Sequence, residues 1–146
     1  MKGSYVLVLR LARRRRVTVG RLGAFDFPCG HYLYFGSAQG GLEHRVRRHL
    51  RSDKKQHWHI DFLTATAPVV EVWCVEGTDR LECVWARAAL ELESVTVPAP
   101  GLGSSDCACR SHLVRLPACW PAVESARLSI LGSEASSRVS LMGPGS

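Results

Sequence analysis

Apolar segments separated by glycine, proline or basic turns divide the chain into predicted strands and helices. β-Branched and aromatic residues predict strands over residues 4–12, 17–22, 31–38, 69–77 and 112–116. Helical spacing of apolar residues predicts a helix over residues 41–52 and a longer one over residues 78–93, with a short helix at 57–68 between them. We therefore expect an α/β (α+β) fold in which helices flank a small, mixed, mostly antiparallel sheet.

The end of the chain differs in composition from the rest. Beyond about Trp120 the residues are mainly serine, glycine and alanine with little periodicity. We expect one domain over residues 1–120 and a loosely ordered tail over residues 121–146. No apolar run approaches the roughly 20 residues of a membrane span, and no signal peptide is recognisable. These features predict a cytoplasmic protein without a membrane partner, whose six cysteines are free, buried thiols.

Positive charge is concentrated in the first part of the chain. Residues 1–55 carry 13 Lys and Arg against 3 Asp and Glu, a net charge of +10, whereas residues 56–146 carry 6 against 10, a net charge of −4. Such asymmetry is typical of a surface that faces a polyanion, and a solvated, arginine-rich surface is the alternative. We predict DNA as the partner, with RNA not excluded and protein partners unknown. The residues expected to contact phosphates are Arg13, Arg14, Arg15, Arg16, Arg47, Arg48, Arg51, Lys54 and Lys55.

Five polar residues on different predicted elements could act together. Tyr5 and Tyr34 lie on strands that could pair, and His49 follows Arg45 by four residues on one helical stripe. Glu82 opens the longer helix beside its apolar face. Each has an ordinary structural explanation, because strand tyrosines usually pack in cores and a glutamate at this position can cap its helix. We expect the five to converge on one cleft. A catalytic assignment of the set requires Tyr5 and Glu82 to lie on the same face of the sheet.

Two short motifs and their continuation resemble the GIY-YIG nuclease superfamily. The sequence GSY at residues 3–5 is similar to the first half of the family motif, and YFG at residues 34–36 is similar to the second. The continuation SAQGGLEHRVRRHL resembles the family's turn from strand to helix. HWHID at residues 57–61 and GSSDCACRSHL at residues 103–113 resemble a small, poorly characterised branch that is also found fused to archaeal endonuclease III-type proteins.

The resemblance implies a metal-dependent endonuclease, a hydrolase that cleaves DNA phosphodiester bonds, with a role in DNA repair. Tyr5 or Tyr34 would act as general base, with its pKa lowered from about 10 by nearby cations. Arg45 would support the phosphoryl charge, and His49 would assist proton transfer or contact phosphate. Glu82 would bind one divalent cation, Mg²⁺ or Mn²⁺. A non-catalytic nucleic-acid-binding module that keeps the fold is the alternative.

Two features depart from the family pattern. The 28 residues between Tyr5 and Tyr34 make a longer gap than is usual, so we expect an inserted hairpin that carries residues 13–16. The chain also contains no asparagine, a residue that the superfamily often uses late in the domain. Ser105 or Asp106 would fill that role, or nothing does.

The segment HWHID offers two histidines and a carboxylate. On a helix His57 and His59 would diverge, so they could bind a metal together only in an extended segment. We favour a structural role, in which Trp58 packs and Asp61 binds a nearby basic group.

The segment CACRSH offers a second possible metal site. Its Cys-x-Cys spacing departs from zinc sites, which usually separate their cysteines by about two to four residues. We favour an ordered loop with hydrogen bonds from residues 103–106. A structural zinc bound by Cys107, Cys109 and His112, with Cys83 or Cys119 as fourth ligand, is the less favoured interpretation.

Overall fold

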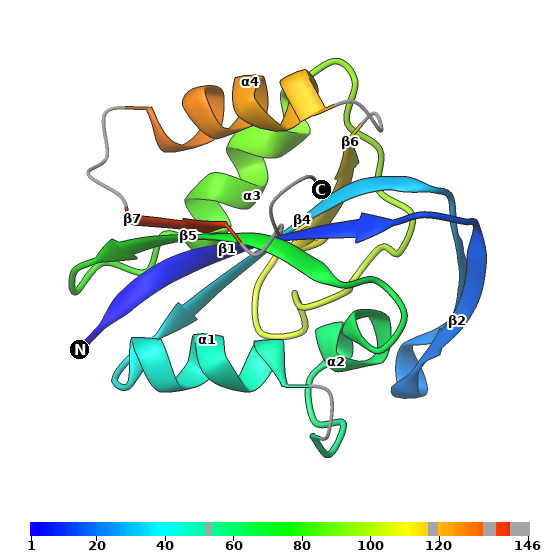
Figure 1. Ribbon diagram of the computed structural model, residues 1–146, viewed down its shortest axis with the longest axis horizontal. Helices are drawn as coiled ribbons and strands as arrows, with labels where there is room; N and C mark the ends of the chain where they lie inside the picture. The colour runs from blue at the N-terminus through cyan, green and yellow to red at the C-terminus, as the bar shows by residue number, and fades with distance from the viewer. Residues whose placement is uncertain (52–53, 117–119, 133–136, 141–146) are drawn as a thin grey trace.

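A five-stranded antiparallel sheet forms the centre of the molecule (Figure 1). The computed structural model describes residues 1–51, 54–116, 120–132 and 137–140. The strands stand in the order β6-β4-β1-β5-β7, and each neighbouring pair is antiparallel. They are β1 (Gly3–Leu11), β4 (Gly30–Ala38), β5 (Val69–Glu76), β6 (Leu113–Leu116) and β7 (Ser137–Ser140). The predicted α+β architecture is confirmed.

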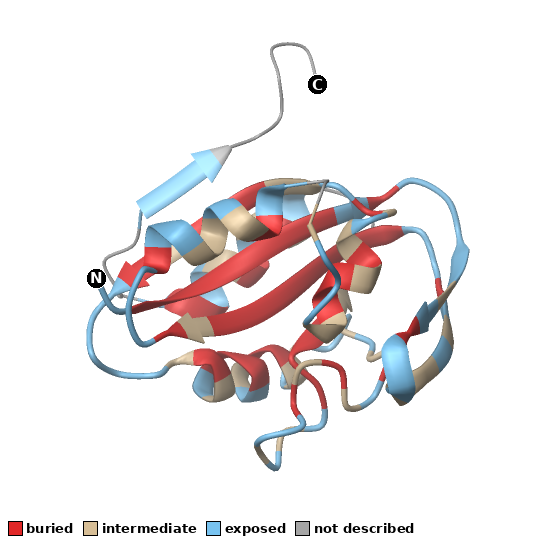
Figure 2. Ribbon diagram, turned by 90° about the horizontal axis from the view of Figure 1, so that it is seen from below, coloured by how far each residue is buried: buried red, intermediate tan, exposed pale blue. Residues whose placement is uncertain are grey.

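Helices cover both faces of this sheet. Helices α1 (Leu42–Leu50) and α2 (His59–Thr64) lie below it in Figure 1, and α3 (Glu82–Leu90) and α4 (Trp120–Leu131) lie above it. Successive side chains of a strand point to opposite faces. Leu7 therefore packs with the α1 and α2 side, whereas Val6 and Val8 pack with the α3 and α4 side. Coverage on both faces explains why the central strands are buried along almost their whole length (Figure 2).

The expected inserted hairpin is present between β1 and β4. Strands β2 (Arg15–Val19) and β3 (Gly23–Phe27) form a separate two-stranded sheet, joined by a 3-10 turn at Gly20–Leu22. Val19 and Phe27 enter the core on the α1 and α2 side. Val19 lies beside the turn and Phe27 at the open end of the hairpin, so both ends are anchored while the arginines at residues 13–16 stay exposed.

Helix α3 packs its buried residues against the sheet and against α4. Trp85, Ala86 and Ala89 are buried, whereas Val84 is 51% exposed. Glu82 is also buried. The small side chains of Ala86 and Ala89 allow α4 to lie close beside α3.

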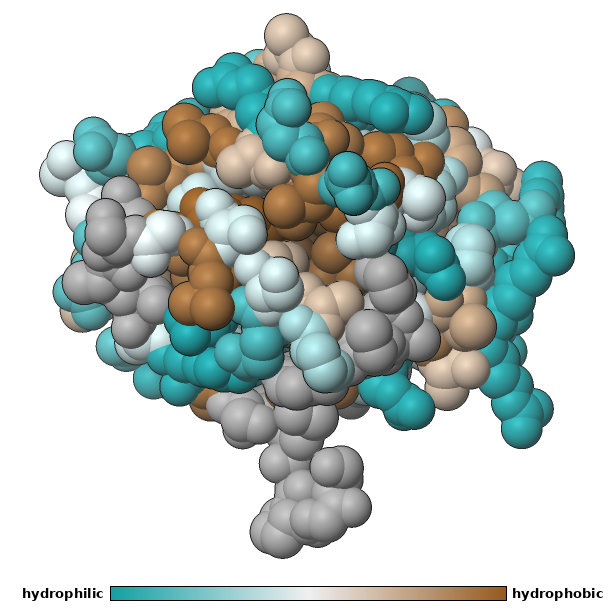
Figure 3. All heavy atoms as spheres, turned by 90° about the horizontal axis from the view of Figure 1, so that it is seen from above, coloured by the Kyte–Doolittle hydropathy of each residue, from teal (hydrophilic) through white to brown (hydrophobic). Residues whose placement is uncertain are grey.

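Residues after 120 include a helix and a strand where sequence analysis expected a loosely ordered tail. Val123, Ala126, Ile130 and Leu131 of α4 are buried in the same cluster as Trp85, so α4 belongs to the folded domain. Viewed from the side of the sheet that α3 and α4 cover, the surface has apolar residues near its middle and polar residues around them (Figure 3). Residues 141–146 lie outside the described part of the chain. Among the helices described, none has the length and apolar character needed to cross a bilayer.

Candidate functional site

A cleft of about 460 Å³ opens where β4 continues past its pairing with β6. Tyr5, Tyr34, Arg45 and Glu82 line it, and His49 contacts Tyr5 from behind. The other lining residues are Phe35, Gly36, Ser37, Trp58, Arg80, Cys83, Gly103, Asp106, Cys107 and His112. The structure therefore brings together the five residues that sequence analysis selected.

Tyr5 and Glu82 reach this cleft from opposite faces of the sheet. The expectation of a common face is therefore wrong, and the five residues do not form the catalytic set that depended on it. Tyr5 lies over Gly36, its partner on β4, on the α1 side; a Cβ at Gly36 would come within 2.4 Å of the Tyr5 ring. Glu82 arrives on α3 and accepts a hydrogen bond from Ser37, which points to the other face. Both can line one cleft because β6 does not cover β4 beyond Tyr34.

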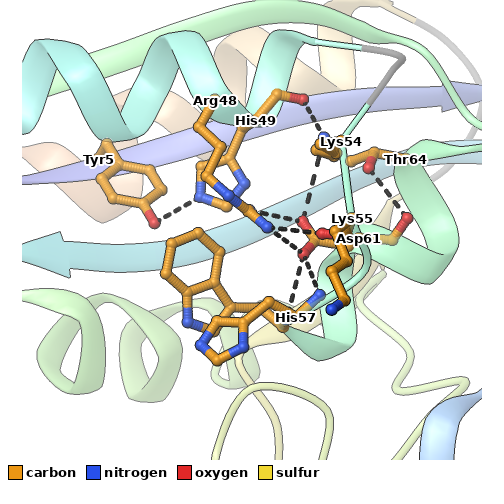
Figure 4. Close-up of polar contacts among 9 residues, drawn as sticks. Tyr5, Arg48, His49, Lys54, Lys55, His57, Asp61 and Thr64 are labelled. Atoms are coloured by element: carbon orange, nitrogen blue, oxygen red, sulfur yellow. Dashed lines mark hydrogen bonds and ion pairs between the residues drawn. The ribbon is translucent and has the colours of Figure 1, made fainter.

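The phenol of Tyr5 and the imidazole of His49 form a buried hydrogen-bonded pair (Figure 4). Tyr5 Oη lies 2.8 Å from His49 Nε2. Burial, followed by the neighbouring Tyr34, raises the pKa of Tyr5 above its ordinary value, and the opposing effect of Arg45 is smaller. Burial likewise raises the pKa of Tyr34. The expectation that cations lower the pKa of either tyrosine is therefore wrong, because desolvation outweighs their charge.

His49 is neutral at physiological pH. Burial lowers its pKa to about 3, and nearby Lys54, Arg48 and Arg45 act in the same direction against Asp61. Its ring packs against the indole of Trp58 with centroids 5.3 Å apart. Its Nδ1 has no hydrogen-bond partner among the described residues. Nε2 can accept the Tyr5 proton when Nδ1 carries the ring hydrogen.

Arg45 is held at the cleft by contacts with β4 and with Trp58. Its Nη1 donates a hydrogen bond to the Ser37 carbonyl at 3.0 Å, and its guanidinium lies 4.9 Å from the centroid of the Trp58 ring. Arg80 adds a second guanidinium to the lining, with 64% of its side chain exposed. The cleft thus combines two guanidiniums with buried phenols, while Glu82, paired with Arg80, and Asp106 add two carboxylates to the lining. Arg45 is the lining cation best placed to contact an anion.

Asp61 organises the segment behind the cleft (Figure 4). Its carboxylate accepts hydrogen bonds from Arg48 at 3.2 and 3.1 Å and from the backbone amides of His57 and Trp58 at 2.9 Å. Burial alone would raise the pKa of Asp61, but these hydrogen bonds lower it overall. The structural role predicted for Asp61 is confirmed. His59 Nδ1 accepts a hydrogen bond from the Gly103 amide and joins this segment to the cleft loop.

The basic residues expected to contact phosphates do not all reach solvent. Residues 13–16 are exposed, and Arg14 and Arg16 each pair with Asp26. Arg47 is exposed as well, paired with Glu43. Lys54 differs, because its ammonium donates to the His49 carbonyl and lies near Asp61, which leaves 8% of its side chain exposed.

Arg48 is the second basic residue drawn inward. It binds Asp61 and the Lys55 carbonyl, and its guanidinium lies 4.3 Å from the centroid of the Trp58 ring. Arg48 and Lys54 therefore act within the fold, since they neutralise a buried carboxylate. The remaining basic residues form the part of the set that faces outward.

Both carboxylate oxygens of Glu82 are already engaged by protein groups. Oε2 accepts from the Ser37 hydroxyl, and Oε1 pairs with Arg80 at 3.1 Å. Mg²⁺ and Mn²⁺ prefer shells built from oxygen ligands. Among the residues that the structure describes, the one group able to hold a metal consists of thiols and an imidazole. The expected Mg²⁺ or Mn²⁺ on Glu82 is therefore wrong.

That group comprises Cys83, Cys107, Cys109 and His112, whose ligand atoms all lie within 4.8 Å of one another. Thiolate and imidazole ligands suit zinc, so the low weight given to structural zinc is also wrong. The Cys-x-Cys spacing made this site the less favoured interpretation of the sequence, although Cys83 was already one of the two candidate fourth ligands. Cys119, the other fourth ligand considered, lies outside the described residues.

The chain belongs to the family described as "Domain of unknown function DUF123", whose model matches residues 4–131. The matched region contains the cleft residues, the thiol cluster and helix α4. Comparison with curated proteins and with solved structures found no match.

Proposed function

We propose that this chain is a GIY-YIG-type endonuclease that hydrolyses phosphodiester bonds of DNA, with a role in repair. The observation that carries the proposal is the 2.8 Å contact between Tyr5 Oη and His49 Nε2 in a cleft that Arg45 lines. The free thiols of the described cysteines are typical of a reducing compartment, so we place the activity in the cytoplasm.

The Tyr5–His49 pair supplies a route for a proton. A water attacks the phosphorus and gives a proton to Tyr5 Oη, while the phenol proton moves to His49 Nε2. The bond from phosphorus to the leaving oxygen breaks, and that oxygen takes a proton from solvent. Tyr5 never needs to become a free phenolate, which agrees with its raised pKa. A phosphate anion bound in the cleft, on the other side of Tyr5, would raise the low pKa of His49.

The arginines supply the charge that the transition state requires. Negative charge develops on the phosphoryl oxygens, and a planar guanidinium can donate two parallel hydrogen bonds to them. Arg45 is positioned by Ser37 and Trp58, so it needs little reorganisation when substrate binds. Arg80, at the exposed rim, can contact a neighbouring phosphate of the same strand.

A non-catalytic nucleic-acid-binding module is the second candidate. The observation that favours it is the exposed hairpin arginines, which are separate from the cleft and do not require chemistry. Binding of this kind rests on phosphate contacts and counterion release alone.

A cleavage screen separates the two candidates. Single-stranded, duplex, flap and branched DNA, with matching RNA, should be incubated with the wild-type chain in buffers with and without divalent cations. On a substrate that is cut, Tyr5→Phe should reduce the rate by about 10²–10⁴-fold while affinity persists, because only the proton transfer is removed. Arg45→Ala should also abolish most cleavage.

Two matched variants serve as controls. Tyr32→Phe removes another buried phenol, which donates to the Pro28 carbonyl away from the cleft, and should keep the cleavage rate. Arg47→Ala removes an exposed arginine of the same helix as Arg45, outside the cleft, and should weaken DNA binding while keeping the cleavage rate on bound substrate. Cleavage at the wild-type rate in Tyr5→Phe would reject the proposed mechanism. Salt-sensitive binding with no cut substrate would support the binding module instead.

A further inference from the structure

We propose that Cys83, Cys107, Cys109 and His112 bind one zinc ion, and that this ion fixes the wall of the cleft formed by α3 and residues 103–112. The inference is independent of the proposed nuclease activity, since it concerns how the wall is built rather than what the cleft does. A zinc ion here joins two segments that are far apart in sequence: the first turn of α3, and the loop after Gly103 that runs to the residue before β6.

The spacing of the four side chains matches a tetrahedral zinc site. With Zn–S near 2.3 Å and Zn–N near 2.0 Å, ligands at tetrahedral angles stand roughly 3.5 Å apart for S···N and roughly 3.8 Å apart for S···S. His112 Nε2 lies 3.6 Å from Cys83 Sγ and 3.4 Å from Cys107 Sγ. All four ligand atoms fall within 4.8 Å of one another. Small side-chain adjustments would suffice to close the shell.

The charge of such a site follows from its ligands. Binding releases three thiol protons to solvent, and three thiolates with a neutral imidazole give the zinc complex a net charge of −1. In the metal-free chain, burial raises the pKa of Cys83 and of Cys109, so the zinc ion itself supplies the charge that favours their thiolates. Cys83 is the second residue of α3 and so lies at the helix N-terminus.

The backbone around the cluster carries its position to the cleft. The His112 amide donates to the Leu102 carbonyl, and its own carbonyl accepts from the Phe35 amide of β4. Gly103 approaches so closely that a Cβ would lie 2.8 Å from the ring of Tyr34, and its φ of +73° also favours glycine. Displacement of the loop would therefore move the residues that border Tyr34.

Metal analysis of the purified chain tests the proposal directly. The protein is purified under reducing conditions without chelator, dialysed against metal-free buffer, and its zinc measured by mass spectrometry. We expect about one zinc per chain. Chain produced with cobalt in place of zinc should show sulfur-to-cobalt charge-transfer absorption, which reports thiolate ligands.

Single substitutions assign the ligands. Cys83→Ser and Cys107→Ser should each lower the retained zinc by about tenfold or more. Cys29→Ser, at an exposed cysteine outside the cluster, is the matched control and should keep the full zinc content. If a ligand variant fails to fold, the metal content and cobalt spectrum of the wild-type chain still decide the matter.

Three results would overturn the proposal. The first is wild-type chain that contains no zinc and takes up none from an equimolar solution. The second is zinc that remains at wild-type level in both Cys83→Ser and Cys107→Ser. The third is a disulfide between cluster cysteines that persists in protein purified with a reductant, because a cysteine in a disulfide cannot serve as a thiolate ligand.

Discussion

The imidazole of His49 lies between the phenol of Tyr5 and the indole of Trp58 and is 2% exposed. Burial lowers its pKa from 6.5 to about 3, with Asp61 opposing and Lys54 assisting the shift. In the unfolded chain the same group takes up a proton near pH 6.5. Between these two values the unfolded state binds more protons than the folded state, so stability rises with pH across this window and falls on acidification.

We predict that the His49 contribution falls by about 1.4 kcal/mol for each pH unit below 6, until the folded pKa is approached. Urea unfolding at several pH values from 7 to about 4.5 measures the effect as a difference between wild type and His49→Gln, which removes the titrating ring. His44→Gln, at an exposed histidine of the same helix, is the control and should keep the wild-type pH dependence. Parallel curves for wild type and His49→Gln would contradict the prediction.

Part of the site could be predicted from residue identities and their spacing. The features that were predicted wrongly depend on burial, which the sequence does not show. The convergence of Tyr5, Tyr34 and Arg45 follows from strand pairing and helical spacing, both of which are visible in the sequence. The direction of the tyrosine pKa shift was predicted wrongly, because desolvation depends on tertiary packing. Lys54 was expected at the surface for the same reason, since only the fold places it beside Asp61.

At the scale of elements, Asp61 connects α1, α2 and the segment between them. Asp61→Asn would leave Arg48 and Lys54 without their carboxylate, so we predict a loss of about 3–5 kcal/mol in the free energy of unfolding. Denaturant titration measures it. Asp26→Asn, which breaks only exposed pairs with Arg14 and Arg16, is the matched control and should cost at most about 1 kcal/mol. Equal effects of the two changes would contradict a structural role for the Asp61 pairs.

The β2–β3 hairpin extends its arginines away from the core. We predict that alanine at all of residues 13–16 weakens DNA binding and flattens its salt dependence, by about 0.9 in the log–log slope for each phosphate that is no longer neutralised. Affinity measured between low and moderate salt gives the slope. Arg127→Ala, on α4 at the other side of the sheet, removes a charge paired with Glu124 and should leave the slope unchanged. An unaltered slope in the hairpin variant would show that these arginines contact solvent and do not bind DNA phosphates.

Periodicity predicted most elements but not every packed face. Strands β1, β4 and β5 were visible as apolar runs, and the hairpin followed from the long gap between the tyrosines. Helix α4 was missed because alanine and serine give weak periodicity, although they suit close packing against α3.

At the scale of the whole molecule, helix α4 completes the apolar cluster on one face of the sheet. Each fully buried aliphatic side chain contributes about 1.5–3 kcal/mol, and α4 buries Val123, Ile130 and Leu131. A chain ending at residue 120 should therefore lose most of the roughly 5–15 kcal/mol typical of a domain. It should unfold without a cooperative thermal transition and bind an apolar dye.

A chain ending at Ser140 keeps the described elements and is the matched control, expected to unfold at the wild-type temperature. If the chain ending at residue 120 also unfolds cooperatively at that temperature, the domain ends near residue 120, as the composition of the sequence predicted. The overall α+β class needed no knowledge of this helix, because the order of strands and helices in the first 116 residues already defines it.

One peptide bond separates Glu82, which faces Ser37 at the cleft, from Cys83, which faces the thiol cluster. A helix turn that serves two neighbouring sites cannot shift for one without shifting for the other. Over evolutionary time, therefore, the two positions should not vary independently. Within the DUF123 family we expect members that have lost two or more of the four cluster residues to differ at position 82 as well, whereas members that keep the cluster retain a carboxylate there. An alignment of diverse members in which the two positions vary freely would show that each site is maintained on its own.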